Sequence, residues 1–362
     1  MKNNKLDFTG QTIYLGLDVH KKNWAVTICF QGIILKTLSM VAKPEQMVKY
    51  LHKNYPNATY LSVYEAGFCG YWIDRKLKSL GVKNIIVNPA DIPTKQKERR
   101  HKTDKVDSKK LARELNNNNL EGIYIPSEEN ESIRALSRLR RQITKDQTRL
   151  KCRIKSLLHF VGIELPENSE LRHWSGKFIK YLSELEFSER SFGKDKAMKL
   201  TLEGLLESLR QQRQILVNII KNLRQVVTEN DSVKKTVNLL QTVPGIGFIT
   251  AVTLCAEIMD ITRFRKFDHL SCYIGFSPAT DSSGEKETVV GLSNQQNKYL
   301  RSMLIESAWT AIRKDPALTQ VYGKLVMRMG KQKAIVRIAK KLLNRIMYVW
   351  KNEKEYVCAV VS

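Results

Sequence analysis

Hydrophobic and polar positions in the first third of the chain alternate over short runs typical of β-strands, with helical runs between the later ones. Residues 12–41, TIYLGLDVHKKNWAVTICFQGIILKTLSMV, form three β-rich runs broken at His20–Asn23 and at Gln31–Gly32, which predicts an antiparallel meander. A helix, a strand, a helix and a strand follow, expected at 45–54, 59–67, 71–81 and 84–92. A further helix is expected after this last strand. This alternation predicts parallel strands joined by helical crossovers, and therefore an α/β domain.

The pattern changes after the polar segment YIPSEEN (124–130), where a long helical periodicity rich in Arg, Lys, Gln and Leu begins. Two segments, 131–161 and 202–226, carry apolar residues at every seventh position: Leu136, Ile143, Leu150 and Leu157, then Leu202, Leu209, Leu216 and Leu223. These heptads predict coiled-coil arms that pair with each other in antiparallel fashion or across subunits. Ordinary bundle helices are the alternative, because polar Asp146 and Gln212 interrupt the seams.

A third region, about 231–325, is expected to be mainly helical and contains LLQTVPGIGFITAVTLCAEI, in which a helix meets Pro-Gly-Ile-Gly before a second apolar helix begins. Glycines Gly245 and Gly247 permit a tight turn whose backbone N–H groups, at a helix N-terminus, can hold a phosphate. This arrangement is typical of a helix-hairpin-helix motif that binds DNA without sequence preference. A purely structural turn between core helices is the alternative.

The last helical stretch, GKQKAIVRIAKKLLNRIMYVW (330–350), places Ile335, Ile338, Leu342 and Ile346 on one face and lysines and arginines opposite. Both a solvated basic face and a nucleic-acid contact are compatible with this pattern. The changes along the chain predict four parts: 1–125, an α/β catalytic domain; 126–230, a helical coiled-coil region; 231–325, a mainly helical domain; and 326–362, a basic amphipathic helix and tail.

Charge narrows the class of partner. The chain of 362 residues has 61 Lys and Arg against 36 Asp and Glu, a formal net charge of +25, which favours nucleic acid as the partner. No apolar run reaches the length of about 18 residues that a membrane span needs, and the start MKNNKLDFTG lacks the apolar core of a signal peptide. We therefore expect a cytoplasmic protein without membrane contact. Six scattered cysteines without a C-x-x-C pair are expected to be reduced, mostly buried thiols.

Four acidic residues lie at strand ends and at a helix start, where a catalytic metal site is expected. Asp18 closes the first strand run, Glu65 closes the later run LSVYEAG, and Asp104 and Asp107 begin the helix after a basic loop. Ends of neighbouring parallel strands meet at one rim of a sheet, and helical positions i and i+3 are neighbours, so the four carboxylates are expected to surround one pocket. Such a cluster is tolerable chiefly around hard divalent cations, here Mg²⁺ or Mn²⁺, and two such ions can clamp a phosphodiester.

Simpler roles stay open for some of these residues: Asp104 as an N-cap or a first-turn acid, and Glu65 as a surface acid. His20 and His101 are interpreted as loop or phosphate-contacting residues. The basic run before the helix is expected to bind nucleic acid and comprises Lys95, Lys97, Arg99, Arg100, Lys102 and Lys105.

With these residues in place, the order Asp…Glu…Asp-x-x-Asp in YLGLDVHKKNWAV, YEAGFCGYW and HKTDKVDSKKLA closely resembles the DEDD transposases of bacterial insertion sequences, the IS-one-ten family. The resemblance continues through IIVNPADIPTKQ, LLQTVPGIGFITAVTLCAEI, FDHLSCYIGFSPATDSSG and NKYLRSMLIESAWTA, nearly the whole chain apart from the tail. Site-specific invertases of pilin genes share the pattern. One departure is Gln296, where the family usually has Gly before the residue matching Asn297.

The resemblance implies a RuvC-like, ribonuclease-H-type first domain that binds Mg²⁺, a helical coiled-coil insertion and a transposase domain with a nucleophilic serine. The matching position is Ser283 in GFSPATDSSG, with Ser282 as its rival. It further implies a covalent phosphoserine intermediate, a guide (bridge) RNA that pairs with donor and target DNA, and a homo-oligomer, a dimer or tetramer. Lys298 and Arg301, in the segment NKYLRSM, are further candidates for nucleic-acid contact.

Other functions remain as alternatives to RNA-guided recombination. The acids alone would also suit a RuvC-like junction nuclease that uses water, or a pilin-type DNA invertase. A non-catalytic nucleic-acid-binding protein assembled through the heptads is the third possibility.

Overall fold

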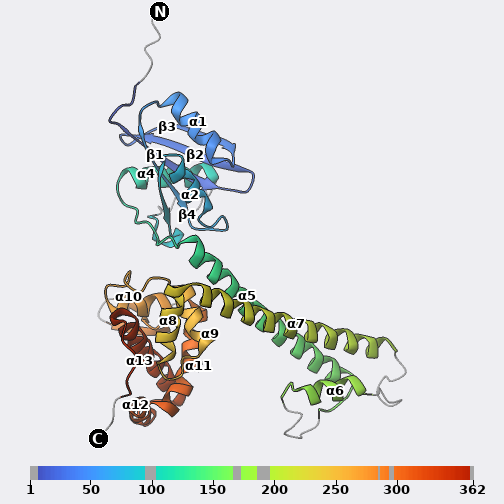
Figure 1. The fold of residues 1–362 in the computed structure, drawn as a ribbon. Helices are drawn as coiled ribbons and strands as arrows, with labels where there is room; N and C mark the ends of the chain where they lie inside the picture. The colour runs from blue at the N-terminus through green and yellow to red at the C-terminus, as the bar shows by residue number, and fades with distance from the viewer. Residues whose placement is uncertain are drawn as a thin grey trace, which may run out of the picture. The chain divides into compact units, whose positions relative to one another are not determined.

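The computed structural model describes residues 7–93, 103–165, 173–185, 196–283, 286–292 and 297–358. The chain divides into two compact units, Met1–Ile125 and Pro126–Ser362, and each is described by itself. Figure 1 shows a mixed α/β first unit and a mainly helical second unit that includes a long pair of helices.

The first unit is built on a five-stranded sheet in the order β3-β2-β1-β4-β5. Pairing is antiparallel between β1 and β2 and between β2 and β3, and parallel between β1 and β4 and between β4 and β5. The predicted meander followed by parallel crossover strands is confirmed. The strands are β1 (Thr12–Val19), β2 (Asn23–Phe30), β3 (Ile33–Val41), β4 (Thr59–Glu65) and β5 (Lys83–Val87).

Successive side chains of β1 face opposite sides of the sheet and show what covers each side. Ile13, Leu15 and Leu17 pack into a core with residues of α1 (Pro44–Asn54) and α2 (Trp72–Ser79). Successive strand residues point to opposite faces, so Tyr14, Gly16 and Asp18 belong to the other face, which α4 (Asp104–Asn116) crosses. A short 3-10 turn, η1 (Pro89–Asp91), follows β5. Asp18, the first of the four candidate acids, therefore lies on the side of the sheet that α4 covers.

The second unit begins with two long helices, α5 (Glu128–Phe160) and α7 (Lys196–Glu229), which lie side by side and run antiparallel (Figure 1). Near the middle of the pair, Gln147 Nε2 of α5 donates to the backbone oxygen of Gln212 in α7 at 3.0 Å, a polar contact between the two helices. The short helix α6 (Gly176–Glu184) packs with Leu150, Ile154 and Leu206 near one end. The two heptad segments thus pair with each other within the chain.

The remaining helices of this unit share one core. It takes residues from the base of α5 and α7 as well as from the helices that follow. Ile335, Ile338, Leu342 and Ile346 are buried in it, which confirms the apolar face predicted for the last helix. The further elements are α8 (Asp231–Gln241), α9 (Phe248–Ile258), α10 (Phe267–Ile274), the hairpin of β6 (Pro278–Ser283) and β7 (Lys286–Leu292), α11 (Lys298–Lys314), α12 (Pro316–Val326) and α13 (Lys331–Asn352).

Cysteine burial differs from the expectation. All six thiols are free, but only Cys29 and Cys255 are buried, while Cys152, Cys272 and Cys358 are exposed. The expectation of mostly buried thiols was wrong because Cys152 and Cys272 occupy solvent-facing positions of helices whose other faces are packed. Every helix among the described residues is too short or too polar to cross a lipid bilayer.

Candidate active site

The ends of two neighbouring strands bring the first two acids together. The parallel register pairs Gly16 with Val63 and Leu17 with Tyr64, so Asp18 and Glu65 are the next residues of β1 and β4. Both alternate onto the face that α4 crosses, because Glu65 shares a side with Val63, which packs against Leu111 of α4. This edge of the sheet therefore carries two carboxylates from adjacent strands.

A glycine allows α4 to approach this edge closely. A Cβ on Gly16 would lie 2.0 Å from the backbone oxygen of Ser108 and 2.4 Å from the backbone nitrogen of Ala112. The hydroxyls of Ser108 and Thr27, on α4 and β2, form a buried hydrogen bond of 2.9 Å. Close backbone contact and this hydrogen bond fix α4 against the sheet, with its first turn near the end of β1.

The first turn of α4 supplies the other two acids. Thr103 is the N-cap, and its hydroxyl accepts a hydrogen bond from the Val106 N–H at 3.3 Å. The alternative in which Asp104 caps the helix is therefore wrong, because Thr103 already holds that position. Asp104 and Asp107 lie in the first turn, where acids also interact favourably with the helix dipole.

The charge of Asp18 is influenced by the other three acids. Burial raises the pKa of the Asp18 carboxyl above its usual value, nearby His20 acts in the opposite direction, and the charges of Asp104, Asp107 and Glu65 raise it further. Ligand atoms of Asp18, His20 and Asp104 all lie within 4.8 Å of one another. The arrangement offers carboxylate oxygens and one imidazole nitrogen to a divalent cation, with Asp104 and His20 exposed to solvent.

Two basic residues belong to this cluster: Lys110, which the sequence analysis missed, and His20, which it interpreted as a loop or phosphate-contacting residue. His20 lies in the loop between β1 and β2, and its Nε2 is 3.4 Å from Oδ2 of Asp18 and 3.4 Å from Oδ2 of Asp104, so this loop residue lies beside the acids. The ammonium of Lys110, with a side chain only 8% exposed, lies 3.7 Å from Glu65 and 3.6 Å from Asp107. The position of Lys110 one turn after Asp107 was the available signal, and the position of His20 two residues after Asp18 was another.

Most of the expected basic run cannot be placed. Lys95, Lys97, Arg99, Arg100 and Lys102, and with them His101, lie outside the described residues. Lys105 is described, and its side chain is exposed in the first turn of α4.

In the second unit, the candidate serines lie near the turn of a two-stranded hairpin. The backbone of Ser282 pairs with Glu287 and that of Ser283 with Lys286, and both serines belong to β6. Side chains of the hairpin are outside the described set. Asn297, the first described residue after the hairpin, makes a hydrogen bond to a buried carboxylate in α9.

That carboxylate is Glu257, which is 1% exposed. Arg138 of α5 donates from Nε to Oε1 at 2.7 Å and from a terminal nitrogen to Oε2 at 2.9 Å, and Arg134 lies 3.3 Å from Oε2. Asn297, directly before α11, donates from Nδ2 to Oε2 at 3.0 Å, caps α11 through Leu300 N–H and donates its own N–H to the Tyr273 oxygen. The start of α11 is thereby tied to α5 and α9.

The Pro-Gly-Ile-Gly turn has a clear packing role. Gly245 has φ +85°, and a Cβ there would lie 2.4 Å from the backbone oxygen of Ser307 on α11, so only glycine fits. Gly247 is exposed at the start of α9 and has open space around it. Of the other two candidates for nucleic-acid contact, Lys298 is exposed, whereas Arg301 is partly buried and donates to the Gly275 oxygen at 3.3 Å.

A mixed sheet with an antiparallel meander, acids on adjacent central strands and further acids on a crossing helix define an RNase H-like domain of the DEDD type, followed by a mainly helical domain. Residues 15–163 match a DEDD transposase model of the IS110 type, and residues 237–323 match the model described as the transposase IS116/IS110/IS902 family. The chain belongs to the IS110 family of DEDD transposases, enzymes that act on DNA.

Individual relatives agree with this membership. The transposase for insertion sequence element IS1111A of Coxiella burnetii is 25% identical over 81% of this chain and 78% of its own length. The transposase for IS1533 of Leptospira borgpetersenii is 28% identical over 82% of this chain and 84% of its own. The pilin gene-inverting protein of Moraxella bovis is 30% identical over 46% of this chain and 54% of its own length. The resemblance drawn from the motifs is thus confirmed.

Proposed function

We propose that this protein is a site-specific DNA recombinase of a mobile insertion sequence, which cuts and rejoins DNA through a covalent bond to Ser283. The observation that carries the proposal is the cluster of Asp18, Glu65, Asp104 and Asp107 beside one edge of an RNase H-like sheet. His20 and Lys110 only partly offset the charge of these four acids, which still disfavour one another's charge, so a binding role for cations accounts for them better than a structural role.

The residues present fit Mg²⁺, or Mn²⁺ in its place. Asp18 and Asp104, whose ligand atoms lie together with that of His20, would hold it, and Glu65 and Asp107 are the further proposed ligands. A bound divalent ion would stabilise the negative charge that develops on a phosphodiester under attack. In its absence, Lys110 partly neutralises Glu65 and Asp107, which explains how the fold tolerates the cluster.

Ser283 is the proposed nucleophile because it occupies the family position in GFSPATDSSG, near the turn of the hairpin of β6 and β7. Its hydroxyl oxygen forms a bond to phosphorus as the bond from phosphorus to the departing deoxyribose oxygen breaks. The serine proton passes to a base, and the departing oxygen takes up a proton. The resulting 5′- or 3′-phosphoserine ester retains the energy of the broken linkage, so a hydroxyl of a second strand can displace the serine and rejoin DNA without ATP.

The partners follow from the same proposal. Donor and target DNA are the substrates, and an element-encoded guide RNA, the bridge RNA, is the proposed source of sequence recognition. The net charge of +25 supports binding of both nucleic acids. A homo-oligomer, a dimer or tetramer, acting in the bacterial cytoplasm completes the proposal, and the paired helices α5 and α7 offer an extended surface for subunit contact.

Strand exchange between two labelled DNA duplexes tests this function, with purified protein, the element ends, the flanking RNA and Mg²⁺. Ser283→Ala and Asp18→Ala should each abolish exchange, whereas Ser282→Ala should retain it as the matched control. An active Ser283→Ala protein would overturn the proposal.

Two other reactions are distinguishable in the same assay. A water-using junction nuclease predicts that Ser283→Ala still cuts DNA and yields only hydrolysed ends. Inversion has the support of the relative named as a pilin gene-inverting protein, and it predicts exchange between two sites on one molecule with the intervening segment reversed.

A further inference from the structure

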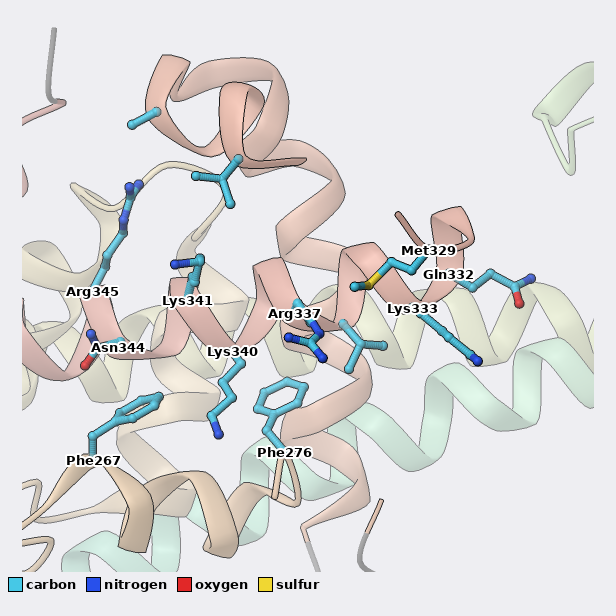
Figure 2. A pocket seen from close by; sticks show the side chains of 13 residues that line it. Phe267, Phe276, Met329, Gln332, Lys333, Arg337, Lys340, Lys341, Asn344 and Arg345 are labelled. Atoms are coloured by element: carbon cyan, nitrogen blue, oxygen red, sulfur yellow. The ribbon is translucent and has the colours of Figure 1, made fainter. Parts of the chain in front are cut away.

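A basic groove crosses the second unit and is lined in part by Phe276, two residues before the start of β6. It has a volume of about 1060 Å³ and lies between α10, α12 and α13. Figure 2 shows α13 along its length, with Phe267 and Phe276 on one side of the helix and Lys340 directed toward the space between the two rings. Lys333, Arg337, Lys340, Lys341 and Arg345 of α13 contribute to its lining.

Among the residues whose side chains are described, few acids compensate the positive charge of this groove. Arg345 pairs with Asp315, a carboxylate with no exposure to solvent, and this pair joins α13 to the start of α12. Within the described part of the chain, the other four cations have no carboxylate in ion-pair contact, and no acidic side chain lines the groove. The charge therefore favours a polyanion rather than a neutral or cationic ligand.

The aromatic wall adds a second kind of contact. Phe267 is partly exposed at the first turn of α10, and the ammonium of Lys340 lies 5.8 Å from the centre of its ring. Rings beside a cationic groove can stack on bases that are not paired with another strand. A duplex, whose bases are already stacked on one another, would gain only the phosphate contacts from the same surface.

The groove is connected directly to the hairpin. Phe276 follows Gly275, the C-cap of α10, and precedes β6 by two residues. The Phe276 N–H donates to the Ser271 oxygen at 2.9 Å, and Arg301 donates to the Gly275 oxygen, so this wall and the base of β6 are held by the same short segment. A nucleic-acid strand bound in the groove would therefore lie close to the start of β6, the β-strand that carries Ser283.

We propose that the groove between α10, α12 and α13 binds a single-stranded stretch of DNA, with its phosphates on α13 and an unpaired base against Phe267. The choice of DNA rather than RNA rests on the proposed function, because the serine attacks DNA. During recombination, the groove would hold the DNA strand that is temporarily without a complementary strand.

Binding of fluorescent oligo(dT) to the full-length protein tests the electrostatic part, measured by anisotropy in EDTA so that no chemistry is required. The groove variant carries Lys333→Ala, Arg337→Ala and Lys341→Ala, all at exposed positions. The control variant carries Lys314→Ala, Lys324→Ala and Arg328→Ala, three exposed cations that do not line the groove. The groove variant should bind oligo(dT) about tenfold more weakly than the control variant and should flatten the plot of log affinity against log salt by about two, as expected for three lost phosphate contacts.

Stacking is tested with Phe267→Ala against Phe267→Tyr. Loss of stacking should weaken oligo(dT) binding about fivefold or more without changing the salt slope, and tyrosine should restore it. Equal losses in the groove and control variants would overturn the proposal, as would a loss confined to duplex DNA or to oligo(rU), or unchanged binding by Phe267→Ala. Because these measurements need neither Mg²⁺ nor Ser283, a failure of the groove is distinguishable from a failure of the proposed reaction.

Discussion

The carboxyl group of Asp18 is partly enclosed and lies near three other acids. Its charge therefore costs the folded protein free energy until a cation or a proton is bound, which is why its pKa is raised. His20 on one side and Lys110 on the other reduce this cost without removing it. At the scale of single residues, the acids that would bind a cation also destabilise the fold when no cation is bound, and His20 and Lys110 limit that destabilisation.

Asp18→Asn tests this balance. Without divalent ions, the variant should melt at the same temperature as the wild type or higher, because one repelling charge is gone. Mg²⁺ at about 100 times its Kd should stabilise the wild type by about 2.7 kcal/mol, and the variant clearly less. Differential scanning calorimetry measures both effects.

The control is Glu45→Gln, which removes an equal charge from α1, away from the cluster, where Glu45 pairs with Lys76. Equal Mg²⁺ stabilisation of the wild type and Asp18→Asn would contradict the assignment of Asp18 as a ligand.

Gly16 tests how closely α4 must approach the sheet. An alanine Cβ would collide with the backbone at Ser108 and Ala112, so Gly16→Ala should destabilise the first unit by about 1–3 kcal/mol and weaken the Mg²⁺ response. Gly122→Ala is the control, because its Cβ would lie 3.5 Å from Ile85, an ordinary contact. Chemical unfolding followed by circular dichroism gives the difference, and similar values for the two variants would contradict this role of Gly16.

At the scale of elements, α5, α9 and α11 meet at one buried carboxylate. Burial opposes the charge on Glu257, but the hydrogen bonds and charges from Arg138 and Arg134, with the hydrogen bond from Asn297, outweigh it and lower its pKa. Removing one member of a buried pair leaves its partners without compensation. The junction of α5, α9 and the start of α11 therefore depends on contacts between residues more than a hundred positions apart.

Glu257→Gln should reduce the free energy of unfolding at neutral pH by about 3 kcal/mol. Because the folded pKa is lowered, the contribution of the wild-type carboxylate is complete above the unfolded value of about 4.3 and is lost as the pH falls below it. The difference between wild type and variant should thus shrink in acid. Urea unfolding across this range measures it, with the exposed Glu306→Gln as control; a constant difference would show that Glu257 is not charged in the fold.

Local patterns predicted the elements well and their contacts poorly. The order of strands and helices in the first unit, the heptad helices and the buried face of α13 followed from apolar spacing within each segment. The approach of α4 to Gly16 and the position of Lys110 depend on the packing of separate elements, which no local pattern records. The same applies to Glu257, whose position in an otherwise apolar helix was the only indication of a buried partner.

At the scale of the whole molecule, the acids lie in one compact unit and the candidate serines in the other. The proposed function requires that both act on one phosphodiester. The strongly basic composition supplies affinity for DNA but does not distinguish a recombinase from a nuclease or a binding protein. Only a product that depends on both units can make that distinction.

The most direct measurement is a search for DNA covalently linked to the protein, after reaction with the element ends and flanking RNA in Mg²⁺ or EDTA. Digestion with trypsin places both serines in residues 267–286, FDHLSCYIGFSPATDSSGEK, and fragment ions separate Ser282 from Ser283. The account predicts an adduct on Ser283 that requires Mg²⁺ and is lost in Asp18→Asn. Cut DNA without an adduct, or an adduct at another residue, would contradict it.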